Sequence, residues 1–339
     1  MDKTRLAETA NALVARAKGV LAIDESTGTI AKRLASIDVK STEPRRRAYR
    51  ELLITAPDIE RYISGMILYD ETFWQKAKNG KSFPKVLAKR GILAGIKVDT
   101  GAKPLAGFPN ETVTEGLDGL RERLADYAKR GARFAKWRAV IAIGDHIPSR
   151  AAIEANAHAL ARYAALCQEA DIVPIVEPEV LSDGSHPIAT SYAVTVATQR
   201  AVFDALAVHG VMLEGMLLKP NMITSGANAA KPAGIEEVAR LTVRGLKAAV
   251  PAAVPGIVFL SGGQSASVAS AHLNAMNTAW SHPWMLSFSF GRALQAPALA
   301  AWKGKAKHVG AAQAALVHRA RLNSEASLGR YAPEMESAT

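Results

Sequence analysis

The sequence contains one cysteine, Cys167, in 339 residues. An intrachain disulfide is therefore excluded, which suits a reducing compartment, and we expect a cytoplasmic protein. Cys167 lies on the apolar face of a predicted helix, in register with Ala157, Leu160 and Ala164. A cysteine at such a position is expected to fill the core and not to act as a nucleophile.

Long hydrophobic runs are also missing. No stretch reaches the roughly 18 uninterrupted apolar residues of a membrane-spanning helix, so no membrane partner is expected. Residues 1–18 are amphipathic, but Asp2 and Glu8 argue against a transit peptide and there is no secretory apolar region. We expect residues 1–18 to form a helix leading into the first strand. The polar segment 328–339, which contains a proline, is expected to be a short mobile tail.

Acidic residues are the minority among the charges, with 31 Asp and Glu against 42 Lys and Arg, a net charge of +11. This balance suits an anionic partner. No basic run or aromatic-interleaved motif concentrates the charge as nucleic-acid binding requires, so nucleic acid is not expected. The sequence favours a phosphorylated small molecule, with solubility alone as the alternative.

Two common cofactor motifs are absent. The eight histidines show neither His-x-His nor His-Glu-x-x-His spacing, so no metal site is predicted. No Gly-x-Gly-x-x-Gly turn follows an early strand. The lack of that turn argues against the rival architecture, an open doubly wound sheet that binds a dinucleotide.

Short β-prone runs alternate with helical segments along the chain. One predicted helix begins after Ser149, a typical N-cap, and another carries acidic residues in its first turn and ends at Pro251. About eight strands joined by helices predict a parallel α/β fold, a (β/α)8 TIM barrel with additional N-terminal and C-terminal helices. No linker marks a second domain, so residues 1–339 are expected to form one. The predicted strands are 19–25, 62–68, 93–98, 133–140, 173–180, 215–221, 256–262 and 284–290.

Charged residues gather at the C-terminal ends of five of these strands. Residues i and i+2 of a strand share a face, and each charge shares its face with a small or apolar residue. Any one charge could simply cap an exposed strand end, but five strands with charges at the same end indicate a shared site, as in barrel enzymes. The set is Asp24, Lys97, Lys136, Arg138, Glu177, Glu179 and Lys219.

A lysine that ends an apolar run, such as Lys219, suggests a specific chemistry. Among other cations and partly desolvated, a lysine has its charged form disfavoured, and a neutral amine can form a Schiff base with a ketone. Glu177 or Glu179 could shuttle the protons, and Asp24 could take a proton from a substrate hydroxyl. The pattern alone does not choose between Lys136 and Lys219 as the nucleophile.

Two segments predict a phosphate site after the seventh and eighth strands. Ser261, Gly262 and Gly263 precede a helix, where glycines let backbone N–H groups approach an anion. The loops after strands 7 and 8 are the usual phosphate site of a barrel. The residues after the eighth strand are Ser289, Gly291 and Arg292.

A second phosphate could lie at the opposite rim of the barrel. Ser26 and Thr29 stand beside Lys32 and Arg33 at the start of a predicted helix. The alternative for the two hydroxyls is N-capping of that helix.

Taken in order, these segments resemble those of class I fructose-bisphosphate aldolase, the metal-free Schiff-base type. The resemblance covers nearly the whole chain and implies reversible cleavage of fructose 1,6-bisphosphate to dihydroxyacetone phosphate and glyceraldehyde 3-phosphate in glycolysis. It also implies a cytoplasmic homotetramer with no metal and no cofactor beyond the covalent Schiff base. The matching motifs are "LAIDESTGTIAKRL", "GIKVD", "FAKWR", "PIVEPE", "LLKPNM", "FLSGGQS" and "FSFGRALQ".

The resemblance also implies catalytic roles. Lys219, in "LLKPN", matches the Schiff-base lysine, and Glu177, in "VEPE", matches the acid/base that dehydrates the carbinolamine, supported by Glu179. Asp24, in "DEST", matches the residue that handles the C4 hydroxyl proton. Lys136 matches an electrostatic stabiliser.

Substrate-binding residues follow from the same matches. Arg138 is implied to stabilise charge beside Lys136, and Lys97 to contact a phosphate. The segments 261–263 and 289–292 match the C1-phosphate pocket, while Ser26, Thr29 and Arg33 match the other phosphate site. Two alternatives stay open: another Schiff-base barrel lyase acting on a ketose 1-phosphate, which should lack one phosphate site, and a non-catalytic scaffold for acidic proteins.

Overall fold

A closed barrel of eight parallel strands forms the centre of the molecule in the computed structural model, which describes residues 1–337. The strands follow one another around the barrel in the order β1, β10, β9, β8, β7, β6, β3, β2. Each coincides with a predicted run, so the predicted (β/α)8 fold is confirmed. The strands are β1 (Gly19–Ile23), β2 (Ile63–Leu68), β3 (Leu93–Lys97), β6 (Ala132–Ile141), β7 (Val173–Val180), β8 (Leu217–Leu218), β9 (Gly256–Phe259) and β10 (Met285–Phe290).

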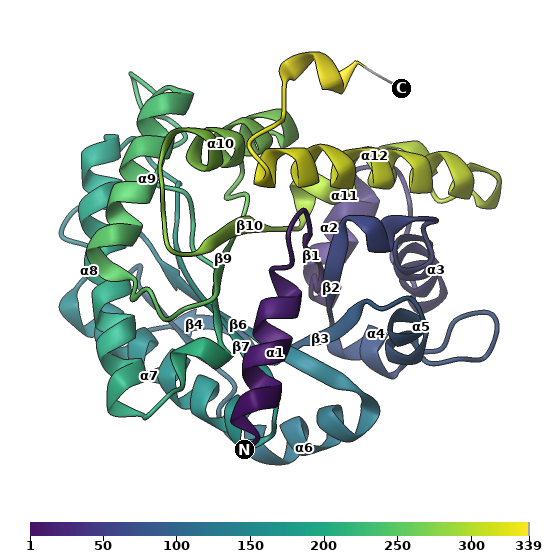
Figure 1. The fold of residues 1–339 in the computed structure, drawn as a ribbon, viewed down its shortest axis with the longest axis horizontal. Coiled ribbons are helices and arrows are strands. Elements are labelled where there is room, and N and C mark those ends of the chain that lie inside the picture. The colour runs from purple at the N-terminus through teal and green to yellow at the C-terminus, as the bar shows by residue number, and fades with distance from the viewer. Residues whose placement is uncertain (338–339) are drawn as a thin grey trace.

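Helices connect the strands and surround the barrel (Figure 1). Except for α1, they bury their apolar faces against its outer surface, in one continuous hydrophobic cluster. As predicted, Ser149 caps its helix by accepting a hydrogen bond from the N–H of Ala152 at 3.1 Å. The helices are α1 (Lys3–Leu13), α2 (Thr27–Ala35), α3 (Glu43–Ile54), α4 (Asp70–Trp74), α5 (Phe83–Lys89), α6 (Leu120–Arg130), α7 (Arg150–Glu169), α8 (Ile188–Val208), α9 (Ile235–Ala249), α10 (Ala266–Ala279), α11 (Arg292–Trp302) and α12 (Val309–Ser327).

Helix α1 closes the end of the barrel where the strands begin. Its Leu6 and Leu13 belong to the same buried cluster as Phe134 of β6 and other inward-facing strand residues. Phe134 fills the barrel so completely that a Cβ atom on Gly95 of β3 would lie 2.2 Å from its Cε2 atom. The barrel interior is therefore a packed core at this end, and a cavity can open only at the other.

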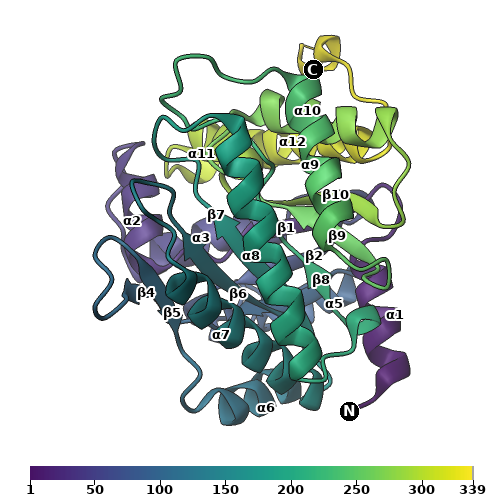
Figure 2. The same ribbon diagram turned by 90° about the vertical axis from the view of Figure 1, so that its left-hand side faces the viewer.

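A two-stranded antiparallel hairpin, β4 (Gly101–Pro104) and β5 (Thr112–Glu115), lies beyond the end of β3. In Figure 2 the hairpin and α1 lie on opposite sides of the molecule. The sequence did not predict it, because its strands are four residues long, polar and largely accessible to solvent.

The N-terminal helix is shorter than expected. Helix α1 ends at Leu13, short of residue 18, and the following turn includes Ala17 with a φ of 65°. At the other end of the chain, the segment expected to be a mobile tail contacts α10, and the carboxylate of its Glu336 bonds the buried Arg319 of α12 at 2.5 and 2.6 Å. Residues 338 and 339 of that expected tail lie outside the described residues.

Among the helices of residues 1–337, none is both long and apolar enough to cross a bilayer.

Candidate active site

The end of the barrel where the strands finish contains a cavity of 680 Å³. Residues in or directly after all eight strands line it, so the fold brings together side chains that are far apart in the sequence. Every site residue predicted from the sequence is among its lining residues. They are Asp24, Ser26, Thr29, Arg33, Lys97, Lys136, Arg138, Glu177, Glu179, Lys219, Ser261, Gly262, Gly263, Ser289, Gly291 and Arg292.

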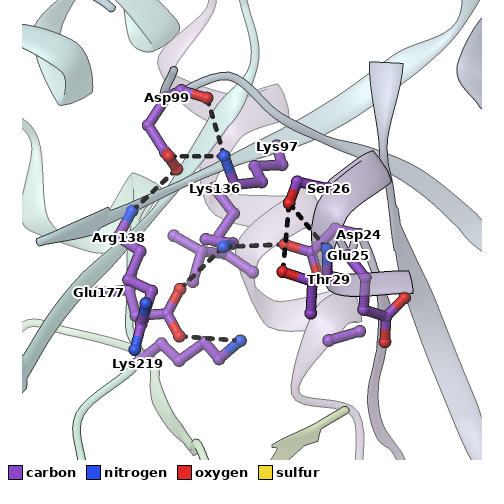
Figure 3. A network of polar contacts seen from close by, with 12 residues as sticks. Asp24, Glu25, Ser26, Thr29, Lys97, Asp99, Lys136, Arg138, Glu177 and Lys219 are labelled. Atoms are coloured by element: carbon purple, nitrogen blue, oxygen red, sulfur yellow. Dashed lines mark hydrogen bonds and ion pairs between the residues drawn. The ribbon is translucent and has the colours of Figure 1, made fainter. Parts of the chain in front are cut away.

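Four charges of alternating sign form a chain across the cavity floor (Figure 3). Lys136 Nζ lies 2.8 Å from Asp24 Oδ2 and 3.1 Å from Glu177 Oε2. Glu177 Oε1 lies in turn 3.1 Å from Lys219 Nζ. The side chains of Lys136, Glu177 and Lys219 are each at most 5 % exposed, so these pairs are scarcely screened by water.

The backbone fixes where Lys219 enters this chain of charges. Strand β8 has only two residues, but the N–H of Lys219 still donates to the carbonyl of Val176 in β7 at 2.8 Å. On the other side, the N–H of Leu260 donates to the carbonyl of Pro220 at 3.1 Å. Lys219 is therefore tied to its neighbours on both sides, although it lies one residue beyond the strand.

Lys136 is held as a cation. Burial by itself would lower its pKa, but the carboxylates of Asp24 and Glu177 outweigh burial and hold the pKa of Lys136 well above its ordinary value. An ammonium group with a raised pKa is a poor nucleophile at neutral pH. Lys219, in contrast, lies within salt-bridge distance of one carboxylate among the described residues, that of Glu177.

The two carboxylates are held as anions. Burial would raise the pKa of the Asp24 carboxyl, but Lys136 and Lys219 together bring it well below its ordinary value. The same two lysines, opposing burial, also lower the pKa of Glu177. The resting site therefore contains two buried carboxylates, each next to a proton donor.

A second layer of ion pairs lies toward the mouth of the cavity. Lys97 Nζ contacts Asp99 Oδ1 at 2.6 Å, and the guanidinium of Arg138 bonds the carboxylate of Glu179. Burial alone would lower the pKa of Arg138, but Glu179 raises it well above its ordinary value. Sequence reasoning missed Asp99, although the i+2 rule applied to Lys97 would have found it.

The loop after β9 has the backbone shape expected of an anion cradle. Gly262 and Gly263 have φ angles of 52° and 82°, in the left-handed region that favours glycine. A Cβ atom on Gly263 would lie 3.4 Å from Nη2 of Arg292, so the missing side chain also leaves room for that guanidinium. The Oγ atom of Ser289 is buried without a hydrogen-bond partner in the described structure, which leaves it available to a bound ligand.

The predicted second phosphate site contains both of the arrangements foreseen for it. Ser26 is the N-cap of α2 and accepts a hydrogen bond from the N–H of Thr29 at 3.4 Å, so the capping alternative holds. Ser26, Thr29 and Arg33 nevertheless line the cavity as well. The guanidinium of Arg33 is bonded to the carboxylate of Glu25.

Glu25 belongs to a buried network that sequence reasoning did not identify. Its Oε2 atom accepts a bond from the buried Arg50 at 2.9 Å, and its Oε1 atom accepts one from Gln295 at 2.6 Å. Tyr49 donates to the same Gln295 at 3.0 Å. These residues lie on α3 and α11, and no local sequence signal connects them with the strand ends.

Residues 1–337 contain no group of three or more His, Cys, Asp and Glu side chains arranged to hold a metal ion.

Comparison with known proteins agrees with this geometry. The model of the family described as fructose-bisphosphate aldolase class-I matches residues 5–339. The chain is 57 % identical over 332 residues to a probable fructose-bisphosphate aldolase class 1 of Xylella fastidiosa, covering 98 % of this chain and 99 % of the relative. It is 52 % identical over 334 residues to fructose-bisphosphate aldolase 2 of Caenorhabditis elegans, covering 98 % and 91 % of the two chains.

A solved structure is similar over nearly the same range. The fructose-bisphosphate aldolase of Plasmodium falciparum, in a ternary co-crystal with TRAP and a small-molecule inhibitor, superposes with a TM-score of 0.96 at 47 % identity. The alignment covers 97 % of this chain and 95 % of that one.

Proposed function

The chain belongs to the class I fructose-bisphosphate aldolase family, and on that premise we propose that its cavity cleaves the sugar bisphosphate through a Schiff base on Lys219. The family's reaction is a carbon–carbon lyase reaction without a metal. The observation that carries the assignment is the 3.1 Å contact between Lys219 Nζ and Glu177 Oε1 inside the cavity. A buried amine and a buried carboxylate at this distance can exchange the protons that Schiff-base chemistry requires.

The first step moves two protons from the nitrogen of Lys219 to the oxygen of the ketone. The ammonium of Lys219 gives a proton to the carboxylate of Glu177, and the neutral amine attacks the C2 ketone of the substrate. The nitrogen of this adduct then passes a second proton to the former ketone oxygen, which gives the neutral carbinolamine. Glu177 returns its proton to the carbinolamine hydroxyl, which leaves as water, and the cationic imine remains on Lys219.

The second step breaks the bond between C3 and C4. The cationic imine on Lys219 takes up the electron pair of that bond and becomes an enamine, while the C4 hydroxyl gives its proton to Asp24 and the aldehyde is released. Because Lys136 and Lys219 keep Asp24 ionised, its carboxylate is in the form that a base requires. Protonation of the enamine at C3 and hydrolysis through Glu177 restore the free lysine.

Lys136 acts in this proposal as a fixed positive charge. Because it contacts Asp24 and Glu177 together, it stabilises each carboxylate whenever that carboxylate is ionised. Arg138 and Glu179 support this end of the cavity from their own ion pair.

Substrate binding uses two phosphate sites at opposite rims. The C1 phosphate is held by the loop 261–263, by Ser289 and Gly291, and by Arg292, and the other phosphate by Ser26, Thr29 and Arg33 with Lys97 nearby. The left-handed glycines and the unpartnered Ser289 hydroxyl support the first site. The proposal also includes a single domain, a homotetramer and a cytoplasmic location. The resemblance of the chain to the family supports the homotetramer, and the lone, buried Cys167 supports the cytoplasmic location.

Borohydride reduction in the presence of dihydroxyacetone phosphate, followed by peptide mapping, tests the proposal. We expect one covalent adduct, on Lys219, and none in the Lys219→Ala variant. That variant should still bind the bisphosphate in a calorimeter, because both phosphate sites remain. An adduct on Lys136 would show that the two lysines are assigned the wrong way round.

The alternative substrate, a ketose 1-phosphate, is separated by steady-state kinetics. If both rims bind phosphate, the 1,6-bisphosphate should have the lower KM, and Arg33→Ala should remove that advantage. Equal KM values for the two sugars would favour the 1-phosphate lyase. A protein with no cleavage activity on either sugar would favour the scaffold.

A further inference from the structure

A second cavity, of 450 Å³, lies outside the barrel between the loop that joins α4 to α5 and the end of α6. It shares no lining residue with the active-site cavity. Of the described residues that line it, none is acidic and five are basic: Lys76, Lys81, Lys85, Lys129 and Arg130. Nothing in the aldolase mechanism accounts for this concentration of charge.

Three of the five cations, Lys76, Lys81 and Lys85, come from one basic segment of the sequence, and α6 supplies the other two. Between Glu71 and Asp99 the chain carries seven basic residues and no acidic residue. Like charges that face one hollow repel one another, which is unfavourable unless an anion neutralises them.

The cations of the cavity are largely without acidic partners. Among residues 1–337, no carboxylate lies within 4.0 Å of the amines of Lys76, Lys81 or Lys85. Lys129 reaches Asp126 at 3.5 Å, but both side chains are more than 60 % exposed, so that pair is weak. Elsewhere in the chain arginines are paired with carboxylates, for example Arg46 with Glu71 at 2.5 Å.

Arg130 is already positioned for binding. Its guanidinium lies over the ring of Trp74, 5.0 Å from the ring centre, and its Nη2 atom donates to the carbonyl of Trp74 at 3.3 Å. Its Nε atom is buried and has no hydrogen-bond partner among the described residues. Stacking of this kind orients the planar fork of donors that binds phosphate oxygens in pairs.

We propose that this cavity binds a small soluble oligophosphate, a molecule with at least two adjacent phosphate groups. Its volume falls in the range of small-molecule sites, about 300–1,000 Å³. Several cations that converge on one hollow match several phosphate charges close together. A nucleic acid would need an extended basic groove and open aromatic faces, whereas Trp74 is already packed against Arg130 and Tyr127.

A site-resolved binding experiment tests the proposal with inorganic tripolyphosphate as the probe. This anion has no ketone and so cannot react with Lys219. Lysine acetylation followed by mass spectrometry reports each amine separately, so occupancy of the active-site phosphate sites does not interfere. We expect tripolyphosphate to protect Lys85 and Lys129 from acetylation and to leave Lys305 and Lys307, exposed on another part of the surface, unprotected.

Two matched double variants separate a specific site from general charge. The first carries Lys85→Ala and Lys129→Ala, and its affinity for tripolyphosphate is read from the protection of Lys76 and Lys81. We expect that affinity to fall about tenfold or more, because each lost charge-assisted contact lowers it at least about a fewfold. Lys305→Ala with Lys307→Ala removes the same charge and should leave it unchanged. Aldolase activity should be normal in both, which shows that both fold.

Three results would overturn the proposal. They are equal loss of binding in the two double variants, uniform protection of all surface lysines, or no protection at Lys85 and Lys129 at millimolar probe. Single-stranded RNA or anionic vesicles could also protect these lysines. If tripolyphosphate did not reverse that protection, the surface would be assigned to a macromolecule, and the proposal would equally be overturned.

Discussion

Replacing Lys136 by methionine should reveal how strongly the central charges depend on one another. The substitution keeps a long unbranched side chain and removes the cation between Asp24 and Glu177. Two buried carboxylates are then left with Lys219 as their nearest cation. We expect the variant to lose cleavage activity and also to unfold more easily than the wild-type protein.

The expected loss of stability follows from the distances. At 2.8 and 3.1 Å, each contact corresponds to an attraction of about 5–6 kcal/mol at an effective dielectric constant of 20, and the burial of the ammonium offsets part of it. Removing one partner from a buried ion pair costs about 3–5 kcal/mol. The change in packing from lysine to methionine adds less than about 1.5 kcal/mol. We therefore expect the free energy of unfolding near pH 7 to fall by about 3–5 kcal/mol.

The pH dependence identifies the cause. In the wild type the pKa values of Asp24 and Glu177 lie below the ordinary 3.8 and 4.5. The two carboxylates therefore contribute fully to stability above about pH 4.5, and this contribution is lost as the pH falls through their lowered pKa values. The pKa of Lys136 lies above the ordinary 10.5, so its contribution is complete below that value and is lost as the pH rises through the raised one. In the variant the carboxyl pKa values should rise. The difference between the proteins should be largest between these limits and shrink below about pH 4.5.

Urea unfolding at fixed protein concentration, at about pH 7 and about pH 4, measures this difference. Lys247→Met is the control, because Lys247 is exposed at the end of α9 and its replacement should change stability by less than about 0.5 kcal/mol. A stability difference that stays the same at both pH values would show that packing, and not charge, causes the loss. A Lys136→Met protein as stable as the wild type would refute the electrostatic reasoning.

Three further predictions concern binding, packing and reactivity. Arg292→Ala should raise KM for the bisphosphate about 10- to 100-fold, the equivalent of one charge-assisted contact, and an unchanged KM in steady-state kinetics would count against its role. Gly95→Ala should lower the free energy of unfolding in the same urea assay by about 1–3 kcal/mol, because the new Cβ would lie 2.2 Å from Phe134. The control Gly310→Ala, at a position with open space around it, should not destabilise the protein. Cys167 is fully buried and burial raises the pKa of its thiol, so iodoacetamide should label it only after denaturation; labelling of the native protein would contradict the buried position.

The barrel could be predicted from the sequence because its strands and helices have different hydrophobic periods. Each predicted strand is a short β-prone run, and the barrel buries the whole of β1, β2 and β7. The exact strand ends were less predictable. The run 215–221 reduces to two residues of β8, because Gly215 belongs to a 3₁₀ turn and Pro220 has no N–H for the ladder. The β4–β5 hairpin has polar strands of four residues, which resemble a loop.

The membership of the site could be predicted because the C-terminal ends of all barrel strands meet at one face. The pattern of charges alone does not choose between Lys136 and Lys219 as the proposed nucleophile, because their surroundings depend on the register between strands. In the β6–β7 pairing Arg138 stands opposite Glu177, and in the β7–β8 pairing Val176 stands opposite Leu218. Lys219, the residue directly after β8, is thereby brought to Glu177. A sequence without coordinates does not contain these alignments.

The two rims proposed to bind phosphate also differ in a way that only the coordinates reveal. At one rim the Ser289 hydroxyl has no hydrogen-bond partner among residues 1–337, so a phosphate there would gain a contact without displacing another. At the other, Arg33 is already bonded to Glu25, and Arg50 holds that carboxylate in place. A phosphate that approaches Arg33 must share the guanidinium with a buried anion, which weakens its attraction. The C1-phosphate rim should therefore contribute more of the binding free energy, and the rim at Arg33 more of the discrimination between one phosphate and two.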